Sequence, residues 1–222
     1  MRTTFAAAAA VIALAGTSAL AQVPWSTPAG NGTFFSWANG QSQNGLFGDP
    51  FLAGGNTLVF TPVGFISEST DGGTVTVGDT VEFDLFADAG FQISALQIQV
   101  FGSYTVAGPG ASSEINGSLD VDEIAGSARS AGSPLFVSPS GPFTSGTGTF
   151  SGTSLADLST GAPFTQIHVA FSADLITISI PGSTAQMSLD VAGSQVAITV
   201  VPAPATAALG LLGLGLVGRR RR

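Results

Sequence analysis

The side chains best suited to acid–base chemistry are one histidine, His168, and 14 acidic residues. A serine hydrolase would use His168 as a general base, between a hydroxyl nucleophile and an orienting acid. The sequence contains no Gly-x-Ser-x-Gly segment to present such a nucleophile. Because His168 lies on the polar side of the alternating segment 166–171, we interpret it as a solvated strand histidine and assign no catalytic residue.

Four acids lie close together in the sequence: Glu114, Asp120, Asp122 and Glu123. A pair of carboxylates can hydrolyse a glycosidic bond, so a secreted hydrolase is one alternative function. Acids on the outer side of a strand also keep a sheet soluble and its edges from pairing. We interpret these four as surface residues and expect no enzymatic activity.

Oxygen ligands could also bind calcium, through these four acids or through Asp71 with Asp79. Their spacing does not match the EF-hand loop, and we assign no metal ligands. The sequence therefore predicts no cofactor and leaves Ca2+ open.

Aromatic residues gather near residue 30, at Trp25, Phe34, Phe35 and Trp37. Exposed aromatic rings can stack on sugars, so a carbohydrate-binding module that contacts extracellular polysaccharide is a second alternative. The whole chain, however, has 16 phenylalanines against two tryptophans and one tyrosine. Binding surfaces favour tryptophan and tyrosine, whose rings carry a polar group, so this balance indicates core packing.

The elements that hold these residues are predicted to be strands, because apolar and polar residues alternate. The alternation is clearest in the segments 81–85, 96–100, 115–121, 167–171, 176–180, 187–191 and 196–200. Turn sequences rich in Gly, Asp and Pro separate these segments. Many short strands at this spacing predict an all-β fold, an antiparallel β-sandwich that is jelly-roll-like or immunoglobulin/cohesin-like, with a barrel as the rival.

Within segment 91–101 the apolar residues change from odd to even positions, which predicts a β-bulge at Ser94–Ala95. We expect the segment 22–56 to be loop with one or two early strands. We expect 127–148, rich in Ser, Gly and Pro, to be an irregular surface insertion. No linker divides 22–200, which is taken as one β-sandwich domain.

Charge excludes some partners. Residues 22–201 contain one arginine, no lysine and 14 acids, which gives a net charge of −13. Such a domain repels nucleic acid and anionic lipid. The chain contains no cysteine, so disulfides and thiolate metal sites are absent.

Residues 1–21 have the features of a secretory signal peptide, expected to form a short helix. Arg2 is the positive residue, 5–15 is apolar, and Ala19 and Ala21 form an A-x-A cleavage site. Signal peptidase is therefore an expected partner, and Gln22 is the expected first residue after cleavage.

Residues 201–222 have the features of a second targeting signal. Val201, Pro202, Ala203, Pro204 and Ala205 precede an apolar segment, and Arg219, Arg220, Arg221 and Arg222 follow it. A helix over 205–218 would be about 21 Å long, against a bilayer core of about 30 Å. We therefore expect a short transmembrane helix. The arginines that follow it are expected to stay in the cytoplasm and to stop translocation of the chain.

This tail resembles the PEP-CTERM sorting signal of Gram-negative bacteria: a Pro-x-Pro motif, a short apolar helix and terminal arginines. Ala203 stands where that family usually has glutamate. The resemblance implies processing by an exosortase-like enzyme, transient attachment to the inner membrane and then delivery to the cell surface or the extracellular space.

Two segments of the body carry weaker resemblances. The segment 74–84 is similar to the opening of bacterial surface sandwiches such as cohesin-like modules. The segment 44–50 is similar to a stretch in uncharacterised PEP-CTERM proteins and implies no known activity. The combined expectation is an exported, non-enzymatic protein of the cell surface or extracellular matrix.

Overall fold

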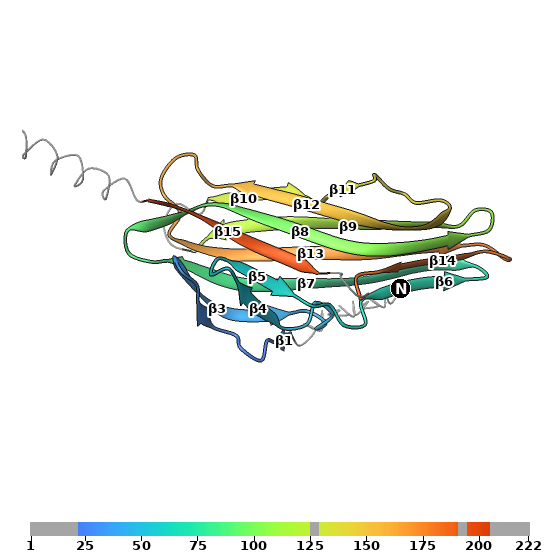
Figure 1. The fold of residues 1–222 in the computed structure, drawn as a ribbon, viewed down its shortest axis with the longest axis horizontal. Helices are drawn as coiled ribbons and strands as arrows, with labels where there is room; N and C mark the ends of the chain where they lie inside the picture. Colours follow the sequence, from blue (N-terminus) through green and yellow to red (C-terminus); the bar gives the residue numbers. More distant parts are fainter. Residues whose placement is uncertain (1–21, 125–128, 191–194, 205–222) are drawn as a thin grey trace, which may run out of the picture.

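The structure, a computed structural model, describes residues 22–124, 129–190 and 195–204, in which the chain forms fifteen strands and no helix (Figure 1). Seven strands form one sheet: β1 (Val23–Pro24), β2 (Gly30–Asn31), β3 (Phe35–Ser42), β7 (Gly73–Ala87), β9 (Ser112–Glu123), β10 (Ser130–Pro134) and β13 (Gln166–Ser179). Eight form the other: β4 (Pro50–Ala53), β5 (Thr57–Phe60), β6 (Ile66–Thr70), β8 (Phe91–Ala107), β11 (Phe136–Ser138), β12 (Gly146–Asp157), β14 (Thr184–Ser188) and β15 (Val196–Pro204).

The strand order is β1-β3-β7-β13-β9-β10 in the first sheet, with β2 beside β3. In the second it is β11-β12-β8-β15-β5-β4, with β14 between β8 and β6. Strands pair antiparallel in both sheets, as in the long pairs β7–β13 and β8–β12. The expected all-β, antiparallel sandwich is confirmed. The two helices expected at the ends of the chain lie outside the described residues.

The core fills the space between the sheets with alternate residues of each strand, as the period of two predicts. Its largest fully buried side chains include six phenylalanines: Phe35, Phe47, Phe60, Phe65, Phe83 and Phe171. Burying a side chain of this size contributes about 1.5–3 kcal/mol relative to leaving it exposed. The core therefore accounts for much of the phenylalanine content of the chain.

The predicted bulge in β8 is confirmed. Val201 of β15 pairs with Ala95 and Pro202 pairs with Ile93, so Ser94 has no partner across the strand. The Ser94 hydroxyl donates to the Val201 carbonyl at 2.9 Å. The extra residue lets Ile93 and Leu96 both face the core despite the change of phase in the sequence.

At one end of the sandwich the two sheets meet through hydroxyl groups rather than hydrocarbon. Ser67 of β6 is hydrogen-bonded to Thr177 of β13 at 2.9 Å, and Ser69 to Ser179 at 2.7 Å. Ser67 and Ser69 also donate to the carbonyls of Val75 and Gly73. All four hydroxyl residues are buried, so these bonds replace those that water would otherwise make.

Two segments contain more regular structure than their composition predicts. The segment 22–56 holds four strands, β1 to β4, rather than one or two. The stretch 127–148 is not an irregular insertion, because β10 pairs with β9 and β11 pairs with β12. The chain crosses from one sheet to the other between these strands at Leu135, whose side chain is buried. Ser and Gly are tolerated there because both strands lie at sheet edges.

Candidate functional site

The outer surface of the seven-stranded sheet carries six of the 14 acidic residues, and we call it the acidic face. It displays Glu82, Asp84, Glu114, Asp120, Asp122, Asp174 and His168 from β7, β9 and β13. The register places His168 between Asp84 and Asp122, and Ala170 between Glu82 and Asp120. Carboxylates therefore occupy both sides of the central strand in two adjacent rows.

His168 is part of a pair that sequence reasoning missed. Its Nδ1 lies 2.8 Å from Asp84 Oδ1, and the other oxygen of Asp84 accepts a hydrogen bond from Asn39 Nδ2 at 2.7 Å. The histidine side chain is 40% exposed and that of Asp84 is 16% exposed. No hydroxyl is hydrogen-bonded to His168 within the described part of the chain. The pair supplies two parts of a catalytic triad without the nucleophile.

Asn39 reaches Asp84 because β3 is irregular at that point. The pairing of β3 with β7 shifts between Ala38 and Gln41, and Asn39 has a φ of 57°. Asparagine adopts this left-handed conformation more readily than most residues. No sequence signal fixes the register of β7 against β13, so the proximity of Asp84 to His168 could not be inferred from spacing alone.

Glu123, one of the four clustered acids, belongs to a structural ion pair. Both of its carboxylate oxygens accept hydrogen bonds from Arg129, at 2.9 and 3.0 Å. Arg129 also donates to the Ala162 carbonyl at 2.7 Å, and its guanidinium lies 3.8 Å from the centre of the Phe164 ring. The hydrogen bond to Glu123 raises the pKa of Arg129. The only strong cation of residues 22–201 is therefore engaged in holding two loops together.

The proposed calcium pair is not formed. Asp79 is buried, and its carboxylate accepts five hydrogen bonds from Ser42 Oγ and from the backbone amides of Asn44, Leu46, Phe47 and Thr80. Asp71 instead accepts from the Gly182 amide at 3.1 Å. No group of three or more His, Cys, Asp or Glu side chains suited to a metal ion occurs among the described residues.

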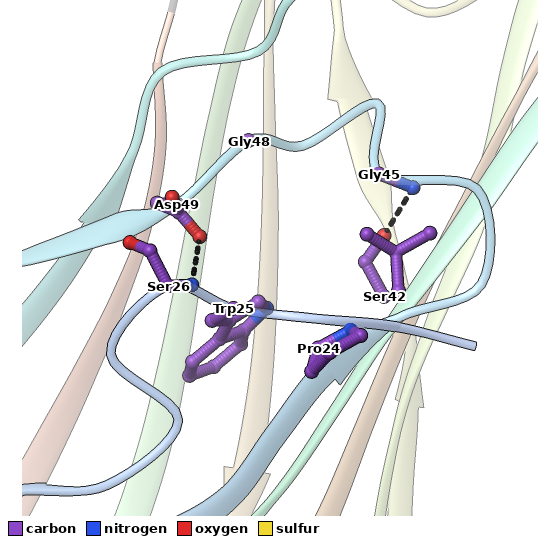
Figure 2. A pocket seen from close by; sticks show the side chains of 8 residues that line it. Pro24, Trp25, Ser26, Ser42, Gly45, Gly48 and Asp49 are labelled. Atoms are coloured by element: carbon purple, nitrogen blue, oxygen red, sulfur yellow. Dashed lines mark hydrogen bonds between the residues drawn. The ribbon is translucent and has the colours of Figure 1, made fainter.

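Asp79 thus anchors the loop between β3 and β4, and this loop borders a shallow cavity of about 290 Å³ (Figure 2). Asp49 accepts from the Ser26 amide at 2.8 Å, and the Gly45 amide donates to Ser42 Oγ at 2.9 Å. Asp49 is the one carboxylate lining this cavity. A pair of acids for glycoside hydrolysis is therefore not present in it.

The tryptophans do not form a sugar-stacking surface. Trp25 is 4% exposed and Trp37 is 9% exposed. Trp25 packs against Phe60 and Phe83, with ring centroids 5.3 and 5.5 Å apart. Among the other two candidates, Phe35 is buried, and the Phe34 ring packs at a tilt against Phe91 with centroids 4.8 Å apart. A carbohydrate site on this protein would need other aromatic residues.

A second cavity, of about 280 Å³, lies where the chain crosses from β10 to β11. Its lining includes Glu114, Ser140 and Phe136, and Phe136 is 65% exposed. Phe143 forms part of the wall and stacks on Tyr104 with centroids 4.0 Å apart. This cavity combines an exposed ring with polar groups, which are the two elements of a small sugar site.

The outer surface of the eight-stranded sheet has the opposite character, and we call the part on β11, β12, β8, β15, β5 and β4 the neutral face. Among all the residues of these six strands, Asp157 at the end of β12 is the one charged residue. The outward side chains are mainly amides, hydroxyls and methyls: Thr57, Gln97, Gln99, Ser151, Thr153, Ala197 and Thr199. Five large apolar residues are also exposed there: Phe51 (57%), Phe101 (38%), Phe136 (65%), Leu155 (57%) and Val201 (37%).

The register gathers several of these apolar residues. Phe136 faces Thr153, Leu155 lies two residues further along β12, and Phe101 of β8 faces Ser151. Alternate residues point to the same side of a sheet, so these three surround Thr153. Sequence reasoning assigned alternate apolar residues to the core and therefore did not single out this patch.

The predicted sorting motif is only partly described. Val201, Pro202, Ala203 and Pro204 continue β15 and pair with residues 91–95 of β8. Gln22, the predicted first residue after signal cleavage, donates to Glu82 Oε2 at 2.6 Å. Ala19, Ala21, Ala205 and Arg219 to Arg222 lie outside the described residues. Within the described ranges, no helix is long and apolar enough to span a bilayer.

Comparison with known proteins adds nothing to this geometry. No protein family and no curated protein matches the chain. The similar solved structures include TmCBM61 in complex with beta-1,4-galactotriose, at 8% identity and a TM-score of 0.25, covering 82% of this chain and 100% of that one. Another is the infectious bursal disease virus Gt strain, at 15% identity and a TM-score of 0.24, covering 78% of this chain and 53% of that one. At these scores the likenesses carry no argument about fold or function.

Proposed function

We propose that this chain is an exported protein of the bacterial cell surface or extracellular matrix, whose sandwich attaches to a partner and performs no catalysis. The observation that supports this best is the separation of charge between its two faces. The acidic face keeps the domain soluble and repels anionic surfaces. The neutral face leaves Phe101, Phe136 and Leu155 in water, and exposed apolar groups of this kind mark interaction surfaces.

Export rests on the two ends of the sequence. The signal peptide at 1–21 directs the chain across the inner membrane, and signal peptidase releases Gln22 as the new N-terminus. The tail at 201–222 holds the domain at the membrane until an exosortase-like enzyme cleaves it and delivers the domain to the surface. Four residues of the motif, Val201 to Pro204, are part of β15 and pair with β8.

Mass spectrometry of the protein from surface and membrane fractions tests this proposal. We expect an N-terminus at Gln22 and a surface form that has lost Arg219 to Arg222. Recovery of a surface form that ends at Arg222 would exclude cleavage. Recovery of the whole protein from the cytoplasm, still beginning at Met1, would exclude export.

A carbohydrate-binding module is the second candidate, and the cavity beside Phe136 favours it. A sugar ring could stack on Phe136 while Glu114 and Ser140 accept and donate hydrogen bonds to its hydroxyls. Affinity electrophoresis through neutral polysaccharides, such as galactan and xylan, measures this binding. We expect retardation to be lost in Phe136→Ala and retained in Phe51→Ala, a matched control because Phe51 is 57% exposed and lies on the opposite edge strand.

A secreted hydrolase requires two carboxylates facing each other across a cleft. Each of the two cavities described above is lined by one carboxylate, Asp49 in the first and Glu114 in the second. The carboxylates that do approach one another lie in rows on the acidic face. This arrangement supports the non-enzymatic proposal over the hydrolase.

A further inference from the structure

We infer that the partner of the neutral face is a second copy of this chain, so that two sandwiches pack through the sheet β11-β12-β8-β15-β5-β4 around a twofold axis. This inference rests on the proposed function in one respect, because it takes the neutral face as the attachment surface. It adds the identity of the partner.

The outward side chains of the neutral face can hydrogen-bond to a second copy of the same surface. Gln97, Gln99, Thr153 and Thr199 each carry both a donor and an acceptor. In a twofold interface residue i contacts residue j of the second copy and j contacts i, so one patch must supply both the donors and the acceptors. Amides and hydroxyls satisfy this condition. Ionised carboxylates are acceptors only, so the acidic face cannot pair with itself.

Electrostatic repulsion favours association through the neutral face over association through the acidic face. Association through the acidic face would bring two sets of carboxylates about 10 Å apart, which is close to the screening length of about 8 Å at physiological salt. Association through the neutral face places the two acidic faces on the outside of four layers, about 30 Å apart. Repulsion across that distance is largely screened. A chain whose residues 22–201 carry −13 can therefore self-associate on one side and not on the other.

The area of the neutral face matches that of a stable dimer interface. The six strands contain about 49 residues. At about 3.3 Å per residue and about 4.8 Å between strands, they present roughly 780 Å² of sheet. A stable interface of standard size buries about 800 Å² on each partner. The face is thus large enough for a dimer, and Phe101, Phe136 and Leu155 supply the apolar contacts near its centre and one edge.

Sedimentation of the full chain in detergent micelles tests the inference. We expect a dimer whose dissociation constant rises at least tenfold in Phe101→Glu and in Leu155→Glu. The matched control is Ile178→Glu, which adds the same charge at an apolar residue of similar exposure, 39% against 38% for Phe101, on the other face. The control is expected to remain a dimer. Equal dissociation constants for all three variants and the unmodified chain would overturn the inference and assign association to the apolar tail.

A second measurement keeps the test valid if a charged variant fails to fold. Because the chain has no cysteine, single cysteines report proximity without background. Gln99→Cys on the neutral face is expected to form a disulfide-linked dimer under mild oxidation. Gln166→Cys, at an exposed glutamine on the acidic face, is expected to form no disulfide cross-link. Equal cross-linking of both variants, or of neither, would overturn the inference. Failure of export would instead be seen in cell fractionation, which neither assay depends on.

Discussion

The Asp79 carboxylate accepts a 2.6 Å hydrogen bond from the Ser42 hydroxyl, and this contact joins β7 to the end of β3 beneath the loop 43–49. The same oxygen accepts from the Leu46 and Phe47 amides, at 2.7 and 3.2 Å. A buried carboxylate surrounded by donors in this way fixes the path of a loop that has no regular structure of its own. The resulting loop places Phe47 in the core.

Asp79→Asn is expected to destabilise the domain strongly. The amide cannot accept at both positions, so buried N–H groups are left without partners. We expect the free energy of unfolding to fall by about 2–4 kcal/mol in urea titrations. Asp120→Asn, at an exposed acid, is the control and should change it by less than about 0.5 kcal/mol. A similar small effect for both would show that the loop does not depend on Asp79.

The end of β15 is expected to contribute to stability although it belongs to the predicted sorting motif. A chain covering 22–204 keeps the pairing of Val201 to Pro204 with β8, whereas a chain covering 22–200 loses it and also the bond from Ser94. We expect the shorter chain to be less stable by about 1–3 kcal/mol. Thermal unfolding followed by circular dichroism measures the difference, and coincident curves would contradict the prediction.

Arg129→Lys should loosen the contact between the residue that precedes β10 and the segment before β13. Lysine keeps the charge but cannot reproduce the two parallel bonds to Glu123 or the stacking on Phe164. The Ile93 amide donates to the Phe164 carbonyl at 2.8 Å, so its hydrogen exchange reports on this segment. We expect faster exchange at Ile93 and unchanged exchange at Val200, whose amide donates to Asn56. Because the pKa of Arg129 is raised, this contribution is present at all pH values below the ordinary arginine pKa and is lost only above it.

The carboxyl group of Asp157 should titrate at lower pH than an ordinary aspartate. Its pKa is lowered mainly by the Ser159 side chain and then by the Ser159 amide, which donates at 2.9 Å. The resulting stabilisation is fully present above the ordinary aspartate pKa and disappears as the pH falls through the lower, folded value. In an NMR titration we expect Ser159→Ala to raise the midpoint part of the way, since the amide remains. An unchanged midpoint would show that the hydroxyl has no role.

Alternation predicted the sandwich well because one face of each strand is buried, as Val81, Phe83 and Leu85 show. The same reasoning located the bulge at Ser94, where the phase of the apolar residues changes. It failed where burial does not require apolar side chains. Ser69 and Ser179 can be buried because their hydroxyls are hydrogen-bonded to each other. A serine in the sequence does not indicate whether it has such a partner.

The candidate surfaces depend on which strands are neighbours, and the sequence alone does not determine this order. His168 meets Asp84 because β13 pairs with β7, and the neutral face exists because β8, β12 and β15 are adjacent. Each strand by itself shows only that its outer residues are polar. The separation of charge between the two faces therefore depends on which sheet each strand joins.

The position of β15 has a consequence for the order in which the domain is assembled. This strand, the last of those described, lies between β8 and β5, and Val196 to Thr199 pair with residues about 140 positions earlier. If the chain folds from its N-terminus, β8 and β5 lack their shared neighbour until residue 196 is available. Until then the strand edges that β15 will cover stay unpaired. Over this interval the eight-stranded sheet is divided, and its exposed edges can recruit strands from other copies. The eight-stranded sheet can therefore be completed only when the residues just before the predicted tail helix at 205 are available.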